Sequence, residues 1–161
     1  MFVPKRNDII LYAISILLCA ASFVVLNHNI EILLFPHKAA MELLYNYSFV
    51  FVDDVGYEQA NGLFTIARNC SGVKLFISLF LIMVFGFLHK YTGTKRKIAM
   101  VVKYYFMAMF IAFAVTVVRI AASIPFCSWE RFHLIHNAMS LGIYFSVCLS
   151  LYFVMERRVR V

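Results

Sequence analysis

The sequence predicts an all-α polytopic membrane protein with about four transmembrane helices and a small extracytoplasmic cap. Two observations predict this fold class. Hydrophobic residues make up 63% of the 161 residues and charged residues only 14%, whereas a soluble domain is about half apolar and about a quarter charged. Four apolar stretches are also long enough to cross a hydrocarbon core of about 30 Å, which takes about 20 helical residues. Soluble, disordered and fibrous classes are excluded, because a chain of this length cannot bury so much apolar surface in one core.

The predicted spans are 9–27, 72–88, 98–124 and 132–155, within a single membrane domain of residues 1–161. The first span carries no charge, and we expect it to be retained as an anchor because no clear signal-peptide cleavage site follows it. The second is apolar except for Lys74, and the third carries Lys103 and Arg119 near its two ends. The fourth contains no Asp, Glu, Lys or Arg.

The distribution of charge predicts the orientation. Nine of the fifteen Lys and Arg residues precede the first span, join the second to the third or follow the fourth, whereas six of the eight acidic residues lie in the other connections. The positive-inside rule therefore predicts an inner-membrane protein with both termini in the cytoplasm and segment 28–69 outside. We expect Lys90–Lys97 and the arginine-rich C-terminal tail to contact anionic membrane lipids, not nucleic acid.

Segment 28–69 is expected to form the cap. Pro36 is expected to interrupt the stretch Ile30–Phe35, so that a short interfacial helix spans His37–Tyr47. The apolar face of that helix is expected to consist of Ala40, Leu43, Leu44 and Tyr47. Asp53-Asp54 predicts a turn and Asn61-Gly62 a hairpin, which together indicate a β-hairpin or a small meander.

Three polar residues occupy costly positions in this topology. Arg119 lies six residues before Pro125, about 9 Å inside its helix, where a charge either faces a polar interior or snorkels to the interface. Cys70 lies where the outer segment enters the second span, with Asn69 or Ser71 expected as N-cap. A thiol in the first helical turn experiences the positive end of the helix dipole. His136 lies in the first turns of the fourth span.

The topology brings these three residues to one depth, at the outer leaflet, from three different helices. A thiol, an imidazole and a guanidinium are the groups needed for acyl transfer through a cysteine nucleophile. His136 would accept the thiol proton and deliver it to the leaving amine, and Arg119 would stabilise the oxyanion. Gly72 would allow another backbone or a substrate to approach closely. No metal or organic cofactor is expected.

The sequence resembles the exosortase/archaeosortase family, and most closely the compact exosortases of the K type. The resemblance rests on three blocks in the family's order, which are Asn69-Cys70-Ser71-Gly72-Val73-Lys74, Val118-Arg119-Ile120 and His136-Asn137-Ala138-Met139-Ser140. It implies a membrane-embedded cysteine peptidase or transpeptidase, with Cys70 as nucleophile, Arg119 as the motif arginine and His136 as catalytic histidine. The substrates it implies are exported proteins whose C-terminal sorting signal comprises a short motif, a transmembrane helix and a basic tail. An envelope or lipid group would accept the acyl group.

This sequence departs from the family pattern at two places. Ser140 stands where the family often has Gly, four residues after the histidine, and Gly142 follows two residues later. His133 is a second candidate for the histidine. The larger family members also have more spans.

Three other functions are open from the residues alone. A metal site would use His133 and His136 with Cys70 and Cys127, although no zinc-binding spacing supports it. A quinone-linked thiol–disulfide oxidoreductase would pair Cys70 with Cys127. A non-enzymatic scaffold or transport subunit would use Arg119 to pair helices and would tolerate the loss of Cys70.

Overall fold

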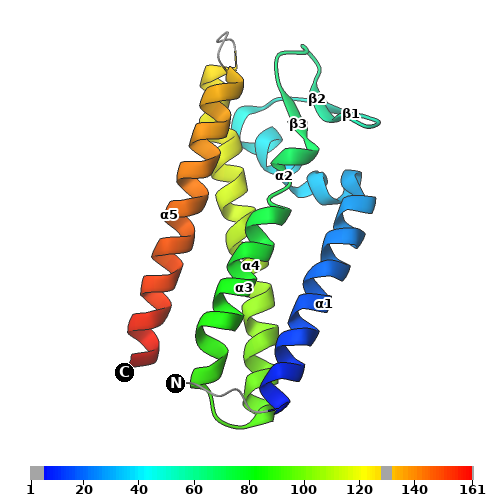
Figure 1. The fold of residues 1–161 in the computed structure, drawn as a ribbon. Helices are drawn as coiled ribbons and strands as arrows, with labels where there is room; N and C mark the ends of the chain where they lie inside the picture. The colour runs from blue at the N-terminus through cyan, green and yellow to red at the C-terminus, as the bar shows by residue number, and fades with distance from the viewer. Residues whose placement is uncertain (1–5, 128–131, 161) are drawn as a thin grey trace.

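The computed structural model describes residues 6–127 and 132–160. Within them, five α-helices accompany a small antiparallel sheet of three strands (Figure 1). In chain order the elements are α1 (Arg6–His28), α2 (Ile30–Tyr45), β1 (Phe49–Val52), β2 (Gly56–Gln59), β3 (Thr65–Ala67), α3 (Val73–Phe87), α4 (Thr94–Ser123) and α5 (Phe132–Arg160). Four long apolar helices could each cross a membrane, namely α1, α4, α5 and α3 extended by its flanking 3₁₀ turns to Arg68–Lys90, which confirms the predicted fold class of a multi-pass membrane protein.

The four long helices run side by side, and α3 is the most enclosed of them (Figure 1). The start of α1 and the end of α5 lie at one end of the bundle, and the sheet lies at the other. Every turn of α3 buries apolar side chains, including Leu75, Leu79 and Met83. By contrast, α1 and α5 expose large apolar side chains such as Leu17 and Leu141. Because lipid tails are as apolar as these side chains, close packing and polar contacts hold such helices together.

Helix α2 begins earlier than predicted, because Pro36 lies inside it and does not end it. Proline removes one backbone hydrogen bond, but the helix buries a continuous apolar and aromatic face that favours the helical conformation. That buried face comprises Leu34, His37 and Met41. Leu43 and Leu44 of the predicted interfacial face are exposed and do not belong to this buried face.

The cap is a three-stranded meander, which is one of the two forms that the sequence predicted. Strand β1 pairs with β2 and β2 pairs with β3, both antiparallel. Asp54 adopts a left-handed conformation in the first turn, and Gly62 does so in the second. The Gly62 N–H donates a hydrogen bond to the Gln59 carbonyl at 2.8 Å and closes that second turn.

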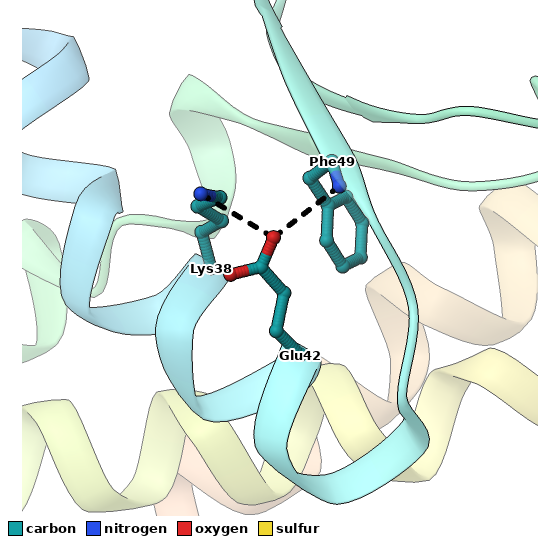
Figure 2. Close-up of polar contacts among 3 residues, drawn as sticks. All are labelled: Lys38, Glu42 and Phe49. Atoms are coloured by element: carbon teal, nitrogen blue, oxygen red, sulfur yellow. Dashed lines mark hydrogen bonds and ion pairs between the residues drawn. The ribbon is translucent and has the colours of Figure 1, made fainter.

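Polar contacts fix α2 between the sheet and the bundle. The Glu42 carboxylate forms an ion pair with Lys38 at 3.3 Å and accepts a hydrogen bond from the Phe49 N–H at 3.4 Å, so that it joins α2 to β1 (Figure 2). On the other side, the Tyr45 hydroxyl donates to the Ala121 carbonyl of α4 at 3.0 Å. The cap is therefore attached directly to the helix that carries Arg119.

At the opposite end of the bundle, the Lys97 ammonium forms a buried ion pair with Asp8. This pair joins the start of α1 to the first turn of α4. The prediction that the whole of Lys90–Lys97 contacts lipid headgroups was wrong for Lys97, because a carboxylate on the neighbouring helix lies within reach of its ammonium.

Candidate functional site

Cys70 lies at the junction between the cap and the bundle. It ends a 3₁₀ turn, Arg68–Cys70, that follows β3 directly, and its side chain is buried. It packs in an apolar cluster that also contains Ile66 of the sheet and Ile120 of α4. The thiol is therefore placed among side chains from the cap and from the bundle.

The predicted N-caps of α3 were wrong. The N-cap is Gly72, with no side-chain hydrogen bond, and Cys70 precedes the first turn of α3. Gly72 has a left-handed conformation with φ +72°, which separates the 3₁₀ turn from the helix. A β-carbon at this position would lie 2.3 Å from Thr116 Oγ1 of α4. The close approach that Gly72 was predicted to allow is therefore confirmed, and the group that approaches is α4.

Arg119 lies inside the protein and does not snorkel, since only 3% of it is exposed. One guanidinium nitrogen, Nη2, donates to the Asn69 carbonyl at 3.5 Å, and the other, Nη1, donates to the Ser140 hydroxyl at 3.2 Å. Arg119 thus connects the residue before the cysteine to α5.

His136 lies in the first turns of α5, one turn before Ser140. Its carbonyl accepts a hydrogen bond of 2.6 Å from the Ser140 hydroxyl. Its ring lies against that of Phe132 with the centroids 5.5 Å apart, and its Nδ1 atom is buried. The side chain of His133, the alternative histidine, lies outside the part of the structure that is described.

Ser140 and Tyr144 contribute to the site and were not predicted to do so. Ser140 can accept from Arg119 because its own hydrogen is donated to the His136 carbonyl. Tyr144, one turn further along α5, places its ring 5.3 Å from the Arg119 guanidinium carbon, a distance typical of a cation–π contact. A serine and a tyrosine at the fourth and eighth positions after His136 share its helix face, and this spacing is the signal that could have identified them.

A pocket of about 370 Å³ opens between α1, α3 and α5, lined by Asn69 and Ser71 on either side of Cys70 in the chain but not by Cys70, Arg119 or His136. The cations Arg68 and Lys74 line it, together with the amide side chains of Asn27 and Asn69 and the ring of Tyr144. None of its lining residues is acidic. The pocket is therefore suited to a polar chain or to a group that carries negative charge.

The four cysteines of the chain are free thiols. Cys127 packs against the same apolar cluster as Cys70 and is partly buried. Among the described residues, no group of three His, Cys, Asp or Glu side chains is arranged to hold a metal ion.

No known protein family matches the chain, and neither a curated protein nor a solved structure is significantly similar to it.

Proposed function

We propose that this protein is a membrane-embedded cysteine peptidase or transpeptidase that cleaves C-terminal sorting signals of exported proteins near the outer leaflet. The observation that carries the proposal is the position of Arg119. A buried guanidinium bonds to the carbonyl of the residue before Cys70 and, through Ser140, to the helical turn that contains His136. The proposal combines this arrangement with the resemblance of the three sequence blocks to the exosortase/archaeosortase family.

The reaction we propose has two steps. His136 accepts the proton of the Cys70 thiol, the sulfur attacks the scissile carbonyl carbon, and the C–N bond breaks as His136 returns the proton to the leaving amine. The product is a thioester between Cys70 and the substrate. Water or an acceptor amine or hydroxyl then attacks the thioester, loses its proton to His136, and releases the Cys70 thiol.

Arg119 supplies positive charge where negative charge develops. A cation fixed next to a forming oxyanion is worth more in a buried site than in water. Among the described residues Arg119 forms no ion pair with an acidic side chain. Burying such a charge is costly, so a role in the reaction explains its presence better than helix pairing does. Two hydrogen bonds and the Tyr144 ring fix its orientation before substrate binds.

The pocket between α1, α3 and α5 would hold the peptide to be cleaved. Arg68 and Lys74 line this pocket, and we propose that they bind carbonyl oxygens or acidic side chains of the recognition motif. The orientation we propose follows the positive-inside rule, with the start of α1 and the end of α5 in the cytoplasm and the cap outside. In this orientation the pocket faces the side to which substrates are exported.

Processing of the substrates in the host tests the proposal. Wild type and the variants Cys70→Ala, Arg119→Ala and His136→Ala are expressed, and the size of C-terminally anchored exported proteins is followed. We expect unprocessed precursor to accumulate in all three variants while each variant remains inserted in the membrane. Cys148→Ala, a cysteine within α5, is the matched control and is expected to process normally.

Two outcomes would contradict the proposal in favour of other functions. Normal processing by Cys70→Ala would favour a scaffold or transport subunit. Loss of function in Cys127→Ala as complete as in Cys70→Ala would favour thiol–disulfide exchange between two cysteines.

A further inference from the structure

The two outer edges of the sheet differ in whether they are covered. The strand order is β1-β2-β3, so β1 and β3 each have one side without a neighbouring strand in the described part of the chain. At the β1 edge, the Phe49 N–H points away from β2 and donates to the Glu42 carboxylate of α2 at 3.4 Å (Figure 2). Because an unpaired strand edge is a template for pairing with another chain, this contact protects the β1 edge.

The edge of β3 has no such cover. The register of β2 and β3 places Gln59 opposite Phe64, and the Gln59 N–H donates to the Phe64 carbonyl at 2.9 Å. Opposite residues in an antiparallel pair alternate between bonded and non-bonded, so the N–H and C=O of the next residue, Thr65, point away from β2. On that side, Thr65 forms no hydrogen bond with another described residue. Thr65 therefore presents a backbone donor and a backbone acceptor at an open edge.

Strand β3 leads directly to the proposed nucleophile. The strand Thr65–Ala67 is followed without an intervening residue by the 3₁₀ turn Arg68–Cys70. Ile66, at the centre of the strand, is fully buried and packs in the same apolar cluster as Cys70, which fixes the strand and the thiol relative to each other. Arg68 of the turn lines the pocket between α1, α3 and α5. A peptide that lies along the β3 edge would therefore be led to the cysteine and to this pocket.

We propose that the recognition motif of the substrate binds as an extended strand added to the free edge of β3, with Thr65 forming its backbone hydrogen bonds. This inference rests on the proposed peptidase function and specifies how its substrate is held. Addition of a strand to a sheet edge gives affinity through main-chain hydrogen bonds, and side-chain pockets then give specificity. An edge of three residues suits a short motif.

The length of the edge favours a substrate over a second copy of this chain as the partner. Three strand residues span only about 10 Å, whereas a stable interface between two proteins buries about 1,200–2,000 Å². A substrate needs fewer contacts at the edge, because its own transmembrane helix already holds it in the same membrane and raises its effective concentration.

A proline at position 65 tests the free edge. Thr65→Pro removes the outward N–H and leaves the hydrogen bonds between β2 and β3 in place, and an edge strand tolerates proline where the N–H faces outward. Thr65→Val, which keeps the N–H and the shape of the side chain, is the matched comparison. We expect Thr65→Pro to process anchored precursors about fivefold more slowly than Thr65→Val, which corresponds to the loss of one hydrogen bond.

Disulfide cross-linking measures the conformation of the bound segment directly. The probe is the anchored precursor that accumulates in Cys70→Ala, with single cysteines placed along the segment before its transmembrane helix. It is expressed with the Cys70→Ala chain that also carries Thr65→Cys. Since side chains of a strand share a face at every second residue, we expect cross-links at alternate positions after mild oxidation. Val50→Cys, at an exposed residue of β1, is the control and is expected to give none.

The outcomes separate this inference from the peptidase function. Processing that does not depend on Cys70 would overturn the peptidase function, and this inference with it. Where processing does depend on Cys70, equal rates for Thr65→Pro and Thr65→Val would overturn the strand alone. So would cross-links that recur every three or four residues, as in a helix, even if Thr65→Pro failed to fold. A disulfide between two Thr65→Cys chains in place of precursor cross-links would assign the edge to a second copy.

Discussion

The Arg119 guanidinium donates a hydrogen bond to the Ser140 hydroxyl at 3.2 Å, and that hydroxyl donates in turn to the His136 carbonyl at 2.6 Å. This chain of two bonds joins α4 to the first turns of α5. A glycine at position 140 could not form it. Ser140 therefore has a structural role here, since it orients the guanidinium that bonds to the carbonyl of Asn69, the residue before Cys70.

Replacing Ser140 tests that role. Ser140→Ala removes an acceptor from a buried guanidinium, and a hydrogen bond to a charged group is worth about 1.5–3 kcal/mol. We expect processing of anchored precursors to slow by at least about tenfold, while the protein remains inserted. Ser146→Ala, at an exposed serine of the same helix, is the control and is expected to have no effect. Full activity of Ser140→Ala would show that Arg119 keeps its orientation without this bond.

Gly72→Ala is expected to destabilise the protein. The new β-carbon would lie 2.3 Å from Thr116 Oγ1, and the backbone has a left-handed conformation that side chains disfavour. We expect a loss of more than about 2 kcal/mol in the free energy of unfolding, seen as a lower Tm in detergent.

Gly142→Ala is the matched control for this variant. A β-carbon at Gly142 meets no atom within 4 Å, and the residue lies inside α5. Since alanine favours a helix over glycine, the Tm of Gly142→Ala is expected to stay the same or rise. An equal loss of Tm in both variants would contradict the argument from close approach.

The four spans could be predicted from the sequence to within a few residues because nothing else explains apolar runs of that length. The same reasoning was wrong at Pro36, because the local preference of proline to end a helix is weaker than the packing of the buried face of α2 against its neighbours. Packing of that kind depends on the tertiary structure, which a local pattern does not contain.

The candidate site, too, could be predicted from the sequence only in part. The sequence left Arg119 either facing a polar interior or snorkelling to the interface, and the structure shows the first of these. Its partners Ser140 and Tyr144 were missed because each is an ordinary helix residue until the contact with α4 is known. The catalytic roles of Cys70, Arg119 and His136 stay predictions.

The buried ion pair between Lys97 and Asp8 predicts that replacing either residue alone will strongly lower the stability of the protein. Asp8→Asn leaves the Lys97 ammonium buried without its counter-charge, which is expected to cost about 3–5 kcal/mol. The double variant Asp8→Leu with Lys97→Met removes both charges and is expected to be closer to wild type in Tm. Lys95→Met, at an exposed lysine of the same turn, is the control. Additive losses in the double variant would contradict a direct interaction.

His37 predicts a dependence of stability on pH. Burial lowers the pKa of His37 from 6.5 to about 4, opposed by its hydrogen bond to the Leu33 carbonyl and assisted by the charge of Arg119. The unfolded chain therefore binds a proton at this position at a higher pH than the folded protein does. Stability from the neutral ring is fully present above about pH 6.5 and is lost as the pH falls toward 4.

The expected size of this effect is a loss of about 2 kcal/mol in the free energy of unfolding between about pH 7.5 and about pH 5. His37→Gln has no titrating ring, so its Tm is expected to fall less over that range than the Tm of wild type. His28→Gln is the matched control because His28 is exposed, and it is expected to keep the wild-type dependence. Parallel Tm curves for wild type and His37→Gln would show that His37 titrates alike in the folded and unfolded states, and would contradict its burial as a neutral acceptor.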